Sequence, residues 1–173
     1  MKKNIFLTGA PAAGKTTVIK KVIERLGVPA NGFYTEEERV AGIRTGFLMR
    51  TVDGRKGYLA HQDLPSDFRI RRYGVNIENI ETIAVPSITP CGKNVIILDE
   101  IGKMECFSES FKRAARAALD SRNPVIGTIT LGGDEFIMRI KNRDDIQIHE
   151  VTPDNRDLLP GMIIKILAEL LAP

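Results

Sequence analysis

The stretch Gly9-Ala10-Pro11-Ala12-Ala13-Gly14-Lys15-Thr16 decides the fold of this chain. It matches the pattern G-x-x-x-x-G-K-[ST], which predicts a loop that binds phosphate groups. Gly9 and Gly14 can adopt backbone angles that a side chain would forbid, so the backbone N–H groups can turn inward and form a concave anion site. We expect Lys15 to contact the β- and γ-phosphates of a nucleotide, and the Thr16 hydroxyl to bind Mg²⁺.

The residues on either side of this phosphate loop have the pattern that such a site requires. Lys3–Thr8 is an apolar run of strand length. From Lys15 to Leu26 apolar residues recur at helical spacing, and Gly27 follows as a stop. A strand, a glycine loop and a helix in this order place a helix N-terminus at the phosphate. The predicted nucleotide-binding residues are Gly9, Ala10, Pro11, Ala12, Ala13, Gly14, Lys15, Thr16 and Thr17.

Composition restricts the class of protein. At 173 residues the chain is long enough to bury a core, and we expect a single domain over residues 1–173. With 25 basic and 22 acidic residues, the net charge of +3 does not indicate a nucleic-acid or membrane partner, although a local basic patch leaves nucleic acid open. Cys91 and Cys106 are too few for a disulfide framework. We find no signal peptide and no apolar stretch that could span a bilayer, and we expect a cytoplasmic monomer.

The segment after the first predicted helix differs from the rest of the chain. Asn31–Thr35, Thr45–Val52 and Arg55–Ala60 have strand character, and the turn sequences Ala41-Gly42 and Asp53-Gly54 separate them. This predicts an antiparallel β insertion over about residues 31–60. Gln62–Tyr73 is polar and indicates a loop.

Helices and buried strands alternate over the rest of the chain. The predicted elements are a helix capped by Asn76, a strand Asn94–Asp99, a helix capped by Ser108, a strand Pro124–Thr130, a helix Glu135–Lys141, a strand Gln147–Val151 and a helix capped by Asp157. This alternation predicts an α/β fold with a mostly parallel sheet between helices on both faces. The antiparallel strands are expected to extend one edge of that sheet.

A carboxylate at the end of a buried strand would complete the phosphate site. The apolar run Asn94–Asp99 ends in such an acid, and Glu100 follows it. We expect Asp99 to hold Mg²⁺ together with Thr16, and Glu100 to orient and deprotonate an attacking water. The predicted catalytic residues are therefore Lys15 and Glu100. The alternative is that the two acids only open a turn.

Three further polar residues have two interpretations each. Thr128, near the end of the next buried strand, either senses the γ-phosphate or bonds to a neighbouring backbone group. Lys103 and Glu105 follow the acid pair, and either line the site or form a pair at the surface.

Two basic segments are candidates for ligand contact. Arg69, Arg71 and Arg72 either bind an acceptor phosphate or act as an arginine finger, or they belong to a solvated loop. Asn155 and Arg156 follow the last predicted strand and are candidates for contact with the base or ribose. The guanine-reading motif Asn-Lys-x-Asp does not occur, which is consistent with the use of several bases.

Several stretches together resemble one family, the thermophile-type nucleoside-triphosphatases, whose animal members are called cancer-related nucleoside-triphosphatases. They are Gly9–Thr16, Gly32–Glu37, Tyr73–Asn76, Asp99–Glu105 and Val151–Asp157, in the order of the family. The resemblance implies a P-loop NTPase domain with a three-layer sandwich, and Mg²⁺-dependent hydrolysis of several nucleoside triphosphates with little base preference. One stretch departs from the family, which often carries a His-Pro-Phe element where this chain has Gly132-Gly133-Asp134-Glu135-Phe136.

The residues and the resemblance together favour a Mg²⁺-dependent nucleoside-triphosphatase with ATP, GTP, CTP and UTP as substrates. Water would attack the γ-phosphate, with Glu100 as the base. One alternative is a small kinase that transfers the γ-phosphate to a nucleotide or metabolite. Another is a nucleotide-gated switch module in which slow hydrolysis acts as a timer.

Overall fold

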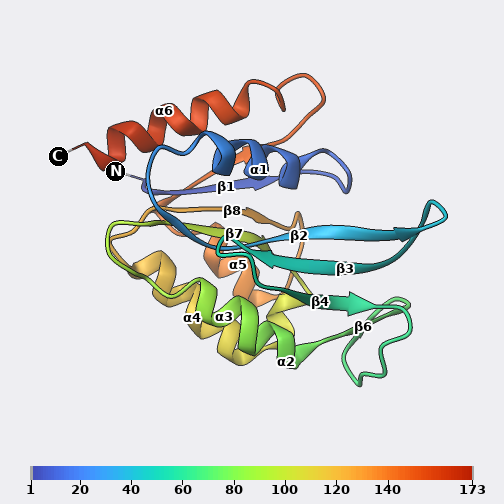
Figure 1. The fold of residues 1–173 in the computed structure, drawn as a ribbon. Coiled ribbons are helices and arrows are strands. Elements are labelled where there is room, and N and C mark those ends of the chain that lie inside the picture. Colours follow the sequence, from blue (N-terminus) through green and yellow to red (C-terminus); the bar gives the residue numbers. More distant parts are fainter. Residues whose placement is uncertain (1, 173) are drawn as a thin grey trace.

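The computed structural model describes residues 2–172, in which helices lie on both faces of one mixed sheet (Figure 1). The strands are β1 (Asn4–Thr8), β2 (Ala30–Val40), β3 (Ile43–Thr51), β4 (Lys56–His61), β5 (Arg69–Ile70), β6 (Tyr73–Val75), β7 (Val95–Ile101), β8 (Val125–Ile129) and β9 (Ile146–Glu150). The helices are α1 (Lys15–Arg25), α2 (Ile77–Asn79), α3 (Val85–Ser87), α4 (Glu109–Asp120), α5 (Glu135–Lys141) and α6 (Leu159–Leu171). A π-helical segment, Ile80–Ala84, joins α2 to α3, and a 3₁₀ turn, Glu105–Phe107, precedes α4.

The strands of the described residues lie in the order β5-β6-β4-β3-β2-β7-β8-β1-β9. Each pair of neighbours among β2, β7, β8, β1 and β9 is parallel. The carboxyl ends of β1, β7 and β8 therefore meet at one edge of the sheet. Strand β2 also starts the antiparallel part, because its residues from Phe33 onward pair with β3. The predicted α/β sheet with an antiparallel extension is confirmed. The extension reaches Val75, beyond the predicted end near residue 60, because the short strands β5 and β6 continue it.

The side chains of the central strands alternate between two hydrophobic layers. In β1, Ile5 and Leu7 pack with α1 and α6, whereas Phe6 packs on the opposite face with α4 and α5. All three side chains are fully buried. Because both faces are covered, these strands appear in the sequence as continuous apolar runs rather than alternating ones. Figure 1 shows α1 and α6 above the sheet and α2 to α4 below it, which is the predicted three-layer sandwich.

Local capping signals place most helix starts correctly. Asn76 accepts a hydrogen bond from the Asn79 backbone N–H at 2.9 Å, and Ser108 accepts one from Phe111 N–H at 3.1 Å. The helix after Asn76 is nevertheless broken into α2, the π-helical segment and α3. Part of the predicted loop Gln62–Tyr73 also forms regular structure, since it contains β5 and the start of β6.

The prediction that Asp157 caps the last helix is wrong. α6 begins at Leu159, and no side chain caps it. A cap at Asp157 would accept from the third residue after it, which is Pro160 and has no N–H. The N–H of Leu159 is already bonded to the Asn155 carbonyl at 3.1 Å. Asp157 pairs instead with Lys21 of α1, at 2.9 Å.

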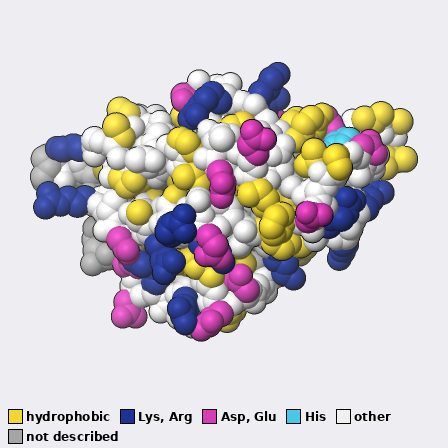
Figure 2. All heavy atoms as spheres, turned by 90° about the horizontal axis from the view of Figure 1, so that it is seen from below, with side chains coloured by type: hydrophobic (Ala, Val, Ile, Leu, Met, Phe, Trp, Pro, Cys, Tyr) yellow, Lys and Arg dark blue, Asp and Glu magenta, His cyan; other side chains and the backbone are white. Residues whose placement is uncertain are grey.

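The surface is mixed in charge on the side of the sheet covered by α2 to α4. There, acidic and basic side chains are interspersed with small apolar areas (Figure 2). No helix within residues 2–172 combines the length and the apolar character needed to cross a membrane.

Candidate active site

The phosphate loop, Gly9–Thr16, connects β1 to α1 at the edge where the carboxyl ends of the parallel strands meet (Figure 1). Gly9 has a φ of 137° and Gly14 a φ of 100°, both in the range that favours glycine. A methyl group on Gly9 would lie 2.9 Å from the carbonyl oxygen of Val151, so the loop also packs closely against the segment after β9. The Lys15 ammonium donates to the carbonyl oxygens of Gly9 and Ala10, at 3.0 and 3.1 Å, and therefore lies over the loop.

Asp99 connects the phosphate loop to the sheet. It lies in β7 with 1% of its surface exposed. Its Oδ2 accepts hydrogen bonds from the Thr16 hydroxyl at 2.8 Å and from the Thr35 backbone N–H at 3.4 Å. Its Oδ1 accepts one from the Thr128 hydroxyl at 2.5 Å. Burial raises the pKa of Asp99, although the bonds from Thr128 and Thr16 and the nearby Lys15 charge oppose that shift.

Two expectations change at this carboxylate. The alternative that Asp99 and Glu100 only open a turn is wrong, because both lie within β7. The hydroxyl of Thr128 bonds to Asp99 and not to a neighbouring backbone group, so its contact with a γ-phosphate stays a prediction. The Thr35 contact has no local signal in the sequence, because it depends on the pairing of β2 with β7.

Glu100 is half-buried next to Asp99. Burial and the neighbouring Asp99 carboxylate raise the pKa of Glu100 to about 7, and the Lys15 charge opposes the shift. A general base is most effective when its pKa lies near the working pH. The position of Glu100 beside Lys15 and Asp99 therefore suits a group that takes a proton from a nucleophile.

The two residues that follow the acid pair differ from each other. Lys103 is exposed, as a surface residue would be. Glu105 is only 3% exposed and begins the turn Glu105–Phe107, so the interpretation of Glu105 as part of a surface pair is wrong. Glu105 belongs to the interior beside Glu100.

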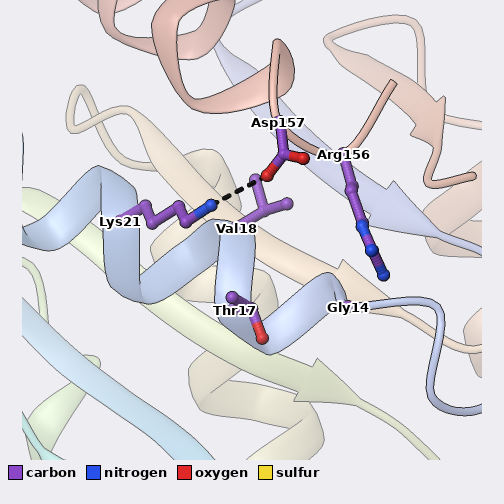
Figure 3. A pocket seen from close by; sticks show the side chains of 6 residues that line it. All are labelled: Gly14, Thr17, Val18, Lys21, Arg156 and Asp157. Carbon is purple, nitrogen blue, oxygen red and sulfur yellow. Dashed lines mark hydrogen bonds and ion pairs between the residues drawn. The ribbon is translucent and has the colours of Figure 1, made fainter. Parts of the chain in front are cut away.

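A pocket of about 240 Å³ continues the phosphate loop along the outer side of α1 (Figure 3). The residues that line it are Gly14, Thr17, Val18, Lys21, Arg156 and Asp157. In Figure 3 the Lys21–Asp157 ion pair lies at one end, and the Arg156 side chain points from the loop before α6 toward Gly14. The structure thus brings Arg156 close to Gly14 of the phosphate loop, and its contact with the base or ribose stays a prediction.

Asn155 lies in the same loop, but its side chain forms hydrogen bonds within that loop. Its Oδ1 accepts from the Thr152 backbone N–H at 2.9 Å, and its Nδ2 donates to the Glu150 carbonyl at 2.8 Å. Both polar ends of Asn155 therefore stabilise the loop that presents Arg156. A direct contact of Asn155 with the base or ribose stays a prediction.

The arginine cluster lies on the antiparallel extension. Arg69 donates to the carbonyl oxygens of Leu64 and Arg72, and the Arg72 guanidinium lies 5.2 Å from the centre of the Tyr73 ring. Two of the three guanidinium groups thus bind to other residues of the antiparallel extension and its loops. This favours the loop interpretation over an acceptor-phosphate site.

Comparisons with known proteins show the family of this chain. A family model described as NTPase matches residues 4–164. The nucleoside-triphosphatase THEP1 of Thermotoga sp. (strain RQ2) is 45% identical over 165 residues, which cover 94% of each chain. The cancer-related nucleoside-triphosphatase of Homo sapiens is 38% identical over 182 residues, which cover 94% of this chain and 96% of that one.

Solved structures give the same result for the fold. The crystal structure of THEP1 from the hyperthermophile Aquifex aeolicus has a TM-score of 0.87 and 36% identity, and the match covers 95% of this chain and 98% of that chain. The solution structure of a human cancer-related nucleoside triphosphatase has a TM-score of 0.84 and 36% identity over 96% of this chain and 98% of that chain.

Proposed function

The chain belongs to the NTPase family and hydrolyses nucleoside triphosphates, and from this premise we propose that it converts ATP, GTP, CTP and UTP to the diphosphate and inorganic phosphate with Mg²⁺. The observation that carries the proposal is the 2.8 Å hydrogen bond between Thr16 and Asp99, which joins the phosphate loop to a buried carboxylate beside Glu100. We further propose that the enzyme acts as a cytoplasmic monomer.

The oxygen donors at the end of the phosphate loop fit Mg²⁺. The Thr16 hydroxyl and the Asp99 carboxylate lie together there, and Mg²⁺ is typically bound by one or two protein oxygens with substrate phosphates and water. These two residues would hold the ion. When bound, Mg²⁺ neutralises charge on the phosphate oxygens.

The protein groups divide the rest of the reaction between them. Lys15 and the N–H groups of the phosphate loop bind the β- and γ-phosphates and stabilise the charge that develops on the oxygen between them. Glu100 accepts a proton from water as the water oxygen bonds to the γ-phosphorus. The bond from that phosphorus to the bridging oxygen breaks, and the products are the diphosphate and inorganic phosphate.

The pocket beside Gly14 is the place we propose for the base. Its side chains offer the flat guanidinium of Arg156, while the Lys21 and Asp157 charges bind each other. A guanidinium can stack on the face of any base, and such stacking does not distinguish one base from another. This arrangement supports the use of several nucleotides.

Replacement of Arg156 with alanine tests the base pocket. We expect KM to rise about tenfold for all four nucleotides, because one stacking contact contributes about 1–3 kcal/mol, while kcat changes little. Steady-state kinetics with each nucleotide measures this. Arg25→Ala, an exposed arginine at the end of α1, is the control. A change confined to one nucleotide, or an unchanged KM for all four, would contradict the assignment.

Phosphate release without an added acceptor tests the proposed function. We expect wild-type protein to release phosphate from ATP, GTP, CTP and UTP with kcat/KM values within about tenfold of one another, and to stop when EDTA removes Mg²⁺. Release that persists in EDTA would refute the metal assignment. If no phosphate were released, and ATP were consumed only with an added nucleotide or metabolite that became phosphorylated, the result would favour a kinase. Release that requires a protein activator would favour a switch.

A further inference from the structure

Strand β9 is the last strand of the sheet, and one of its two edges is free. It pairs with β1 on one side, and no strand within residues 2–172 lies on the other. Natural proteins often protect such an edge with lysine, proline or a bulge. β9, with the sequence Ile-Gln-Ile-His-Glu, contains neither residue, and its register with β1 is continuous. The free edge of β9 is therefore open to a further strand.

The hydrogen bonds to β1 show which backbone groups of β9 face outward. The Asp145 carbonyl accepts from the Asn4 N–H at 3.2 Å, and the Val151 N–H donates to the Thr8 carbonyl at 2.8 Å. Backbone groups of successive strand residues point to opposite sides, so the odd-numbered residues of this segment bond to β1 and the even-numbered ones face away. Ile148, in the middle of β9, thus presents both its N–H and its C=O at the free edge.

The outward groups on either side of Ile148 are partly bonded already. The Ile146 N–H donates to the Arg143 carbonyl at 3.3 Å, and the Glu150 carbonyl accepts from Asn155 Nδ2 at 2.8 Å. The Ile146 carbonyl and the Glu150 N–H have no such partner within residues 2–172. Together with the two groups of Ile148 they form a row of two donors and two acceptors. Another extended chain carries donors and acceptors at the same spacing and can bond to the whole row.

A hollow of about 400 Å³ lies along this edge, beside the start of α6. Three apolar residues that line it, Ile148, Leu158 and Met162, are 37, 74 and 36% exposed. Side chains of an added strand would alternate between the two faces of the sheet and cover this apolar surface. Glu150 also lines the hollow, is exposed, and forms no ion pair within residues 2–172. The surface therefore fits an extended segment with apolar side chains and a lysine or arginine near Glu150.

We propose that the free edge of β9 binds an extended segment of a partner protein, which adds a strand to the sheet. The segment pairs with the backbone of Ile148 and its neighbours, covers Leu158 and Met162 with apolar side chains, and places a basic side chain at Glu150. None of these residues belongs to the phosphate loop or to the proposed catalytic pair. The inference therefore goes beyond nucleotide hydrolysis and does not depend on the proposed base or metal ligands.

Selection from a library of random peptides of about seven residues, roughly the length of a strand, tests the proposal. We expect selected peptides to carry apolar residues at alternate positions and a lysine or arginine, with Kd measured by fluorescence anisotropy. Methylation of those alternate backbone nitrogens that face β9 should weaken binding at least about tenfold, whereas methylation of the others should have little effect. Equal binding by both methylated forms would overturn the proposal, and so would a library that yields no binding peptide.

Variants of the edge test the same peptides on the protein side. Ile148→Pro removes an outward N–H, which an edge strand tolerates, so we expect normal phosphate release and peptide binding weakened at least about tenfold. Met162→Asp, at an exposed position of the hollow, should weaken binding as well, and replaces the proline variant if that one does not fold. His149→Pro is the control for the register, because it removes a bond to β1 and should lower Tm. Undiminished peptide binding by folded Ile148→Pro or Met162→Asp would overturn the proposal.

Amide hydrogen exchange measured by NMR gives the result residue by residue. The Ile148 N–H should exchange quickly in the free protein and at least about tenfold more slowly with saturating peptide, while the His149 N–H is protected in both states. Unchanged exchange at Ile148 would overturn the proposal. Sedimentation equilibrium distinguishes the other occupant of the edge. Self-association that is lost in Ile148→Pro would assign the edge to a second copy of this chain and would also overturn the proposal.

Discussion

Glu100→Gln is expected to lower kcat for ATP hydrolysis by about 100- to 10,000-fold, the contribution typical of a general base. The carboxamide has the shape of the carboxylate but cannot accept a proton from water. Glu100 lies beyond the phosphate loop, beside Asp99, and no contact assigned to nucleotide binding involves it. The Kd of ATP should therefore change by less than about threefold.

Single-turnover hydrolysis and equilibrium binding measure these two effects. Glu24→Gln, at an exposed position of α1, is the matched control and should behave as wild type. If Glu100→Gln retained wild-type turnover, the base would have to be another group. If it lost ATP binding together with turnover, the residue would be part of the binding site instead.

Lys15→Ala is expected to lower kcat by about 100- to 1,000-fold and also to weaken triphosphate binding. The Lys15 ammonium already lies over the phosphate loop, where it bonds to the Gly9 and Ala10 carbonyls. A nucleotide phosphate would accept these N–H bonds in place of the carbonyls. Removal of the ammonium takes away the positive charge that opposes the charge on the transferred phosphate.

The comparison of ATP with AMP makes the Lys15 prediction specific. Lys15→Ala should weaken binding of ATP at least tenfold more than binding of AMP, because AMP lacks the β- and γ-phosphates that Lys15 is assigned to contact. Lys165→Ala, an exposed lysine of α6, is the control. Equal weakening of ATP and AMP binding would contradict the assignment of Lys15 to those two phosphates.

Local sequence signals predict the phosphate loop and its flanking elements well. A strand, the glycine pattern and an amphipathic helix occur in one short stretch, so no distant contact is needed to recognise them. The same holds for α4 and α5, whose caps Ser108 and Asp134 each precede the helix that they start. Of these two caps, only Ser108 is predicted from the sequence. The observed bounds of α5, Glu135–Lys141, nevertheless agree with the predicted helix.

Contacts between distant segments explain what the sequence does not predict. Thr35, Thr128 and Thr16 meet at Asp99 because β2, β7, β8 and α1 converge there. The meeting of Thr16 with Asp99 is predicted from the phosphate loop and the acid in the buried strand, but no pattern in the chain marks Thr35 or the bond from Thr128 to Asp99. The burial of Glu105 is likewise not predicted by the sequence, because a carboxyl group in a polar stretch has the pattern of a surface residue.

The wrong prediction that Asp157 caps α6 also depends in part on a contact between distant segments. Its residue type fits a helix cap, and its position before an apolar helix supports that interpretation. The proline three residues later and the distant cation Lys21 prevent it. The first of these is visible in the sequence, whereas the second depends on the packing of α1 against α6.

Hydrolysis of ATP in water enriched with ¹⁸O tests the central claim most directly, because it identifies the nucleophile and the phosphorus that it attacks. If water attacks the γ-phosphorus, each phosphate released carries one oxygen from the solvent and the ADP carries none. Mass spectrometry of both products distinguishes these positions. Solvent oxygen in the ADP, or phosphate without it in the absence of any acceptor, would contradict the mechanism.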